Sequence, residues 1–284
     1  MAFQDLSKRF VTSIISLAVL ICILMFSCCG VVSWVIALFT CCLGAIGIWE
    51  YGKLSKITEK KGLVELCIAI GSLIILGFFI STLDLSLSLL PLILLCLGVI
   101  CIFLYHFDKI EGAIYSIANS LFGICYVSIP LGLALKVLYL YRSCEAGSDG
   151  RLWLLYILVV TKITDIGAYF GGRLFGHKKL APDLSPGKTV TGAIVGFCSA
   201  ILFSFLFYLV SHWVSGFHLT LIQSLWLGAL LGCLGQVGDL AESLLKRDAD
   251  VKDSNRLPGL GGVLDMLDSL LFTIPVIYFF LYVY

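Results

Sequence analysis

Long uninterrupted apolar segments constrain this chain more than any other feature of its sequence. Several run for 17 residues or more, enough for a helix to cross about 30 Å of hydrocarbon. Strands or loops at that depth would leave backbone N–H and C=O groups unpaired, so helices are expected. Only 13% of the residues are charged, against about a quarter in an average soluble domain. We therefore predict an all-α, polytopic membrane protein.

The apolar segments define nine candidate membrane-spanning helices. The apolar run that begins at Phe10 is longer than the core of a typical signal peptide, and no small-residue cleavage pattern follows it. It is therefore predicted to be a retained first helix. The predicted spans are roughly 10–29, 31–49, 66–82, 85–105, 112–140, 152–171, 192–214, 219–240 and 268–284.

The basic residues orient these spans. If the N-terminus is cytoplasmic, 15 of the 19 Lys and Arg residues fall in cytoplasmic segments, as the positive-inside rule requires. This arrangement places the loops 173–191 and 241–267 together on the cytoplasmic side. We predict a multi-pass protein of the inner (cytoplasmic) membrane whose active site faces the cytoplasm.

The intramembrane charges divide the chain into two regions. In residues 1–140, only Asp84 is identified as an acid that could lie within the membrane, and this region is predicted to be a transmembrane scaffold. Residues 150–284 contain most of the remaining candidates for chemistry. They are predicted to form the catalytic transmembrane region.

The strongest candidate site begins at the end of the eighth predicted span. Asp239, Glu242, Ser243 and Lys246 are spaced i, i+3, i+4 and i+7, so a continuous helix would present all four on one face. Acids at a membrane boundary are costly unless they face a polar cavity, a cation or one another. A charged interfacial loop with solvated side chains is the alternative interpretation.

The start of the ninth span repeats this spacing. Asp265, Asp268 and Ser269 again lie at i, i+3 and i+4, after a P-G-L-G-G turn at 258–262. If the two helix ends meet, up to four carboxylates gather beside Lys246 and several other bases. Crowded carboxylates indicate a divalent metal, and Mg²⁺ is usually held by one or two carboxylates together with substrate phosphates.

A second group of polar residues lies around the sixth span. Lys162 and Asp165 form an i, i+3 pair inside it, which indicates either a functional site or a polar clamp between helices. Gly167, Gly171 and Gly172 are interpreted as a surface for close helix packing. Further on, the segment 185–189 (S-P-G-K-T) is expected to form a turn that could cradle phosphate, although it is not a Walker A loop.

The motifs in residues 150–284 can be compared with known signatures. The chain carries G-D-L-A-E-S (238–243), S-L-L-K-R (243–247), K-D (252–253), P-G-L-G-G (258–262) and D-M-L-D (265–268), preceded by D-I-G-A-Y (165–169) and S-P-G-K-T-V-T-G (185–192). Together they resemble the CTP-dependent phosphatidate cytidylyltransferase family, the CDP-diglyceride synthetases. The chain departs from the family pattern at Leu260, Met266 and Thr191, where His, Arg and Glu are usual.

The resemblance implies that CTP and phosphatidate react to give CDP-diacylglycerol and pyrophosphate for phospholipid synthesis. As a hypothesis, catalysis is assigned to Asp239, Lys246, Arg247, Asp265 and Asp268. Mg²⁺ is assigned to Asp239, Glu242, Asp265 and Asp268, and the sequence leaves a second cation open. Substrate binding is assigned to Ser185, Lys188, Thr189, Ser243, Lys252, Asp253, Gly261 and Gly262, with Asp165 on the cavity floor.

Two other functions remain open at this point. A related CTP-dependent transferase or kinase that acts on a polyprenol or an ether lipid would share these acids. An ion-coupled transporter could instead use Lys162, Asp165, Asp239 and Glu242, but no repeated halves are visible and the charges gather at one face. No nucleic-acid partner is expected, and a homodimer is left open.

Overall fold

The protein is described from a computed structural model, which covers residues 25–55, 57, 62–108, 110–140, 149–251 and 262–283. Eight helices in this part of the chain are long and apolar enough to cross a membrane. They coincide, within several residues at each end, with the second to ninth predicted spans. The all-α, polytopic architecture is therefore confirmed. The first predicted span, 10–29, lies almost wholly outside the described residues, so the ninth helix and the N-terminal orientation stay predictions.

The helices form two consecutive groups of four. The first group is α2 (Gly30–Leu54), α3 (Leu63–Leu83), α4 (Leu90–His106) and α5 (Ala113–Leu138), with a short 3-10 turn, η2 (Leu85–Leu87), before α4. The second group is α6 (Gly150–Phe175), α7 (Val190–Ser211), α8 (Leu221–Asp248) and α9 (Val263–Val283). The expected helical continuation through Lys246 is correct, because α8 runs eight residues beyond the predicted span.

A small antiparallel hairpin between α6 and α7 is the exception to the helical fold. Its strands are β1 (Lys179–Ala181) and β2 (Ser185–Thr189), with Ala181 opposite Ser185. The prediction of a turn at 185–189 is wrong, because the turn lies at 182–184 and the S-P-G-K-T segment is the returning strand. Strand geometry points alternate side chains to opposite faces, so Lys188 and Thr189 are directed differently.

Polar N-caps fix where the helices of the second group begin. The Asp149 carboxylate accepts the backbone N–H of Arg151 at the start of α6, and the Thr189 hydroxyl accepts that of Gly192 at the start of α7. At α8, Thr220 and Gln223 form a reciprocal capping box. Thr189 is both the last residue of β2 and the N-cap of α7. The backbone of Lys188, the residue before it, is therefore fixed relative to the start of α7.

Glycines bring α6 and α7 into close contact, as the sequence indicated. A Cβ atom added at Gly171 or Gly167 would overlap the side chain of Val195 or Ser199, and one at Gly172 would lie 2.9 Å from Thr189 Oγ1. On the facing helix, a Cβ at Gly196 would lie 2.7 Å from the Thr164 carbonyl oxygen. Small residues therefore let the two backbones approach, as in other membrane helix pairs.

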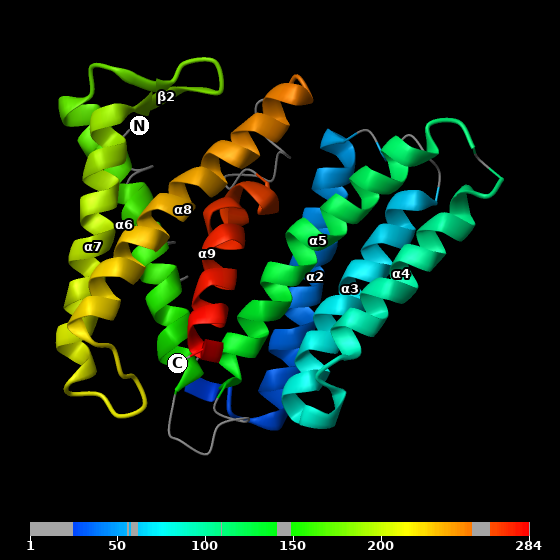
Figure 1. The fold of residues 1–284 in the computed structure, drawn as a ribbon, viewed down its shortest axis with the longest axis horizontal. Helices are drawn as coiled ribbons and strands as arrows, with labels where there is room; N and C mark the ends of the chain where they lie inside the picture. The colour runs from blue at the N-terminus through cyan, green and yellow to red at the C-terminus, as the bar shows by residue number, and fades with distance from the viewer. Residues whose placement is uncertain are drawn as a thin grey trace, which may run out of the picture.

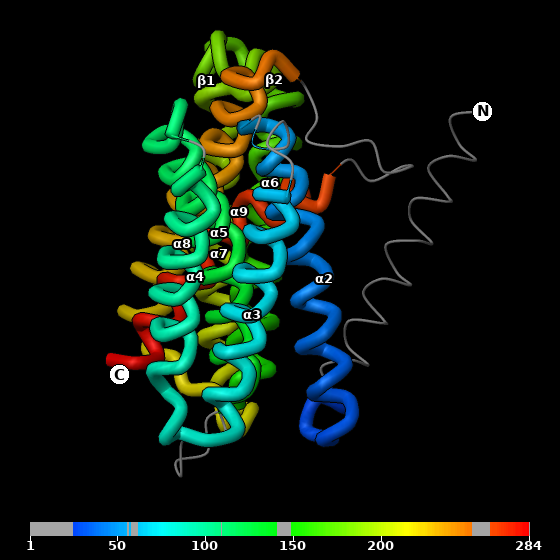
Figure 2. The backbone as a smooth tube through the Cα atoms, turned by 90° about the vertical axis from the view of Figure 1, so that its right-hand side faces the viewer, coloured from blue at the N-terminus to red at the C-terminus, as the bar shows by residue number. Residues whose placement is uncertain are grey.

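Helix α9 connects the two groups of helices (Figure 1). Leu264 and Leu271 belong to a buried apolar cluster with α2, α3 and α5, whereas Ile274 and Ile277 belong to a second cluster with α6 and α8. The hairpin, the end of α8, the start of α9 and the end of α2 lie at the same end of the bundle (Figures 1 and 2). The two loop regions that the sequence singled out are therefore neighbours in space.

Candidate active site

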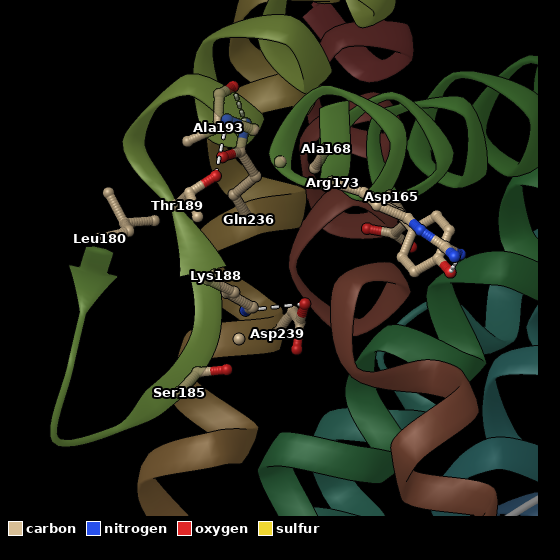
Figure 3. Close-up of a pocket in the computed structure, with 14 residues that line it drawn as sticks. Asp165, Ala168, Arg173, Leu180, Ser185, Lys188, Thr189, Ala193, Gln236 and Asp239 are labelled. Carbon is tan, nitrogen blue, oxygen red and sulfur yellow. Dashed lines mark hydrogen bonds and ion pairs between the residues drawn. The ribbon is translucent and has the colours of Figure 1, made fainter. Parts of the chain in front are cut away.

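A cavity of about 440 Å³, lined in part by charged side chains, opens at this end of the bundle between α6, the hairpin, the start of α7 and α8. It contains three residues that the sequence assigned to the site from separate segments, Asp165, Lys188 and Asp239 (Figure 3). Ser185 and Thr189 also line it, as does Gln236, which the sequence interpretation did not single out. The predicted cavity position of Asp165 thus agrees with the geometry.

An ion pair between Lys188 and Asp239 closes one side of the cavity. Lys188 Nζ lies 2.7 Å from Asp239 Oδ2, so strand β2 is tied to the first charged residue of α8 (Figure 3). Arg247 Nε adds a second tie by donating to the Leu184 carbonyl oxygen at 3.1 Å. These contacts confirm that the hairpin and the end of α8 converge, although the sequence alone did not pair the residues.

A second set of polar groups connects α6 with α9. The Ser269 hydroxyl oxygen lies 2.8 Å from Asp268 Oδ1 and 3.3 Å from Asp165 Oδ2. Lys162 Nζ is 3.4 Å from Asp165 Oδ2 and donates to the Met266 carbonyl oxygen at 3.2 Å. Lys162 therefore places a cation beside Met266, the position at which the family pattern has Arg.

Lys246 joins the charged ends of α8 and α9. Its Nζ lies 2.5 Å from Glu242 Oε2 and 3.0 Å from Asp265 Oδ1, and the Glu242 side chain is only 1% exposed. Asp265 Oδ2 also accepts the backbone N–H of Gly262 at 2.9 Å. The predicted meeting of the two helix ends is therefore confirmed.

The four predicted carboxylates form two groups and not a single cluster. Asp239 and Asp268 interact electrostatically and lie near Asp165, whereas Glu242 and Asp265 share Lys246. Within the residues that the structure describes, no three His, Cys, Asp or Glu side chains are arranged to enclose a metal ion. The carboxylate oxygens nevertheless suit Mg²⁺, which takes few protein ligands and completes its shell with water and phosphate. The Mg²⁺ assignment stays a prediction.

For several predicted site residues, the structure gives no direct evidence of a role in binding or catalysis. Ser243 lies on α8 directly after Glu242 and is partly buried. The hydroxyl of Thr189 accepts a hydrogen bond as the cap of α7. Lys252, Asp253, Leu260 and Gly261 lie outside the described residues, so their assignments are not tested.

The sequence interpretation missed one buried acid in the first half of the chain. Glu50, at the end of the second predicted span, is 0% exposed and accepts backbone N–H groups of α9. Asp84, which was singled out instead, is exposed and accepts the backbone N–H of Ser86 in the turn before α4. Hydrogen bonds from the side chain and backbone of Ser86 lower the pKa of Asp84. Glu50 stands at the end of an apolar run, close to Lys53, a position typical of a solvated helix end, so no local pattern distinguishes it.

The fold and this cavity define a polytopic membrane protein that gathers cations and carboxylates at one end of its helices. The sequence matches the Cytidylyltransferase family over residues 7–284, nearly the whole chain. The chain therefore belongs to that family.

Two curated relatives match over nearly the same length, and a third matches over about half of it. The phosphatidate cytidylyltransferase of Chlamydia pneumoniae is 36% identical over 288 residues, which span 99% of this chain and 93% of the relative. That of Chlamydia trachomatis serovar D is 35% identical, over 97% and 92% of the two chains. The Bacillus subtilis enzyme of the same name is 45% identical over 133 residues, which cover 46% and 48%.

Proposed function

We propose that this protein transfers the CMP group of CTP to phosphatidate and so forms CDP-diacylglycerol and pyrophosphate. The relatives that cover nearly all of the chain carry the name of this activity. The observation that carries the proposal most directly is the cavity in which Lys188 and Asp239 meet at the end of a membrane bundle. Such a cavity offers both a cation for phosphate and carboxylates for a divalent metal.

An apolar groove beside the cavity supports a lipid as the second substrate. The groove measures about 400 Å³, is lined by α7, α8 and Leu180 of β1, and shares Leu180, Ala193 and Gln236 with the cavity. A phosphatidate molecule has the same division into a charged headgroup and apolar chains. Its phosphate would enter the cavity while an acyl chain lies along the groove.

The reaction needs no activated Ser or Cys side chain. An ionised phosphate oxygen of phosphatidate attacks the α-phosphorus of CTP, a new P–O bond forms, and the bond to the bridging oxygen breaks, releasing pyrophosphate. The protein must bring two polyanions together and stabilise the charge on the departing pyrophosphate. We assign this work to Lys188, Lys246 and Arg247.

Asp239 and Asp268, with Asp265 and Glu242, would hold Mg²⁺. When bound, the metal would neutralise phosphate charge and polarise the phosphoryl group. In the structure, Lys188 and Lys246 hold three of these carboxylates. Substrate phosphates would compete with these carboxylates for the two lysines. Carboxylate oxygens would then become available to the metal.

The charge distribution also supports a location. The hairpin and the adjoining ends of α6 and α8 lie at the same end of the bundle (Figure 2). Six of the ten Lys and Arg residues of 150–284 lie there: Arg173, Lys178, Lys179, Lys188, Lys246 and Arg247. By the positive-inside rule this end would face the cytoplasm, where CTP is available. We place the protein in the inner membrane, with the cavity open to the cytoplasm.

The test is pyrophosphate release by the purified protein from labelled CTP. We expect release that requires Mg²⁺ and phosphatidate, with the label recovered in CDP-diacylglycerol. Polyprenol and ether-lipid acceptors are assayed in parallel. A preference for either of them would replace phosphatidate as the substrate. Absence of turnover with every acceptor would contradict a transferase function.

A further inference from the structure

A buried carboxylate outside the cavity holds the start of the helix that carries Asp265 and Asp268. Glu50, near the end of α2, accepts the backbone N–H of Val263 through Oε1 at 3.0 Å and that of Leu264 through Oε2 at 2.8 Å. These are the first two residues of α9. The two carboxylate oxygens thus bind adjacent N–H groups at one helix terminus.

The contact joins segments that are far apart in sequence. The end of α2 and the beginning of α9 lie side by side, with more than two hundred residues between Glu50 and Val263 (Figure 2). A helix start has N–H groups without partners in its own helix, and its positive dipole end attracts an anion. A fully buried carboxylate is costly unless such donors surround it. The Glu50 carboxylate therefore accepts hydrogen bonds from the otherwise unpaired N–H groups of α9, and these N–H groups stabilise the buried carboxylate.

The two residues that contact Glu50 directly precede the segment of α9 that carries Asp265 and Asp268. Asp265 is the next residue after Leu264, and it receives Lys246 and the Gly262 N–H through its two oxygens. Asp268 lies one turn later and contacts the Ser269 hydroxyl, which also contacts Asp165, a residue that lines the cavity. A shift or fraying of the first turn of α9 would move both carboxylates relative to α8.

We propose that Glu50 is a positioning residue for the reaction: it fixes the first turn of α9 and thereby the placement of Asp265 and Asp268. Glu50 does not touch the cavity itself. The inference rests on the proposed function for its kinetic consequence only. The structural part, that Glu50 orders the start of α9, stands independently of the substrate.

The first experiment compares Glu50→Gln with Glu65→Gln. Gln keeps the volume of Glu50 but has one acceptor oxygen, and its NH₂ group would face a backbone N–H. Glu65 is exposed, in the first turn of α3, and provides the matched control. For Glu50→Gln we expect faster hydrogen exchange at 262–270, unchanged exchange in α3, and kcat lower by at least about tenfold. KM for both substrates is expected to stay within about twofold.

A double-mutant cycle then isolates the contact. Val263→Pro removes the N–H that Oε1 accepts, at a helix position where proline is well tolerated. In this background the NH₂ group of the introduced glutamine no longer opposes a donor, so Glu50→Gln should reduce kcat by less than about threefold. Equal losses in both backgrounds would overturn the proposal. Wild-type exchange at 262–270 in Glu50→Gln, or equally accelerated exchange throughout the chain, would also overturn it.

These measurements separate the two claims. If the wild-type protein forms no CDP-diacylglycerol, the proposed function fails, while the exchange data still test the placement of α9. If the wild type is active and Glu50→Gln retains full kcat, only the positioning role fails.

Discussion

The two groups of helices differ in how their charged side chains are paired. In α2–α5, most buried residues are apolar, and Glu50 has its charge satisfied by backbone N–H groups of α9. In α6–α9, lysines and carboxylates meet in pairs around a cavity, as in Lys188 with Asp239. The carboxylate of Glu50 is fully covered, whereas the side chains of Lys188 and Asp239, which line the cavity, are 24% and 35% exposed and can be reached by a substrate.

Among the changes that test this difference between the two groups, replacement of Asp239 by Asn should have the largest effect on activity. The variant keeps the shape of the side chain but loses the charge that pairs with Lys188 and, by our assignment, with Mg²⁺. We expect kcat for CDP-diacylglycerol formation to fall at least about a thousandfold, because several kcal/mol of charge stabilisation is lost. Asp248→Asn, at an exposed position on the same helix, is the control and should remain active. Near-normal turnover by Asp239→Asn would refute the assignment.

Removal of the Lys188 side chain should have the next largest effect. Lys188→Ala leaves Asp239 without its partner and takes a cation from the cavity. We expect kcat/KM for CTP to fall about a hundredfold, measured by pyrophosphate release. Lys178→Ala, which removes an exposed lysine just before the hairpin, should change it by less than about threefold. Comparable losses in the two variants would indicate a general charge effect.

Two glycine substitutions compare the packing of the two groups. A Cβ at Gly196 would press on the backbone carbonyl of Thr164, which cannot move aside, whereas one at Gly44 meets the end of the flexible Ile75 side chain. Gly196→Ala should therefore destabilise the protein by about 1–3 kcal/mol, and Gly44→Ala by less. Thermal unfolding in detergent measures both. The reverse order would show that α6 and α7 are not held together by close backbone contact.

Asp149→Asn should have the smallest effect, and one that depends on pH. Burial raises the pKa of Asp149, but hydrogen bonds from the side chain and backbone of Arg151 outweigh it and leave the pKa below its usual value. A lowered pKa stabilises the fold above the unfolded-state value, near pH 4, and this stability is lost as the pH falls through the folded-state value. We expect a loss of less than about 1 kcal/mol at pH 7, since Asn can still cap α6. The difference from wild type should vanish in acid melts.

Local sequence patterns predicted most of the helices and part of the site. The i, i+3, i+4 spacing of acids correctly predicted that Glu242 and Lys246 share a face of α8 and meet Asp265. The same pattern could not divide the carboxylates into two groups, since that depends on how α8 crosses α9. The strand at 185–189 was also missed, because its pairing with 179–181 is a contact that no local propensity determines.

The sequence by itself determined that the chain crosses the membrane as helices, and it predicts that the chemistry lies in residues 150–284. The physical reason is local: apolar length sets the number of spans, and charges at helical spacing persist in a membrane only where they are used or paired. Tertiary structure alone decided that Lys188 pairs with Asp239 and that Glu50 holds the start of α9. These contacts join distant segments, and they depend on how the helices pack and on which buried groups must satisfy one another.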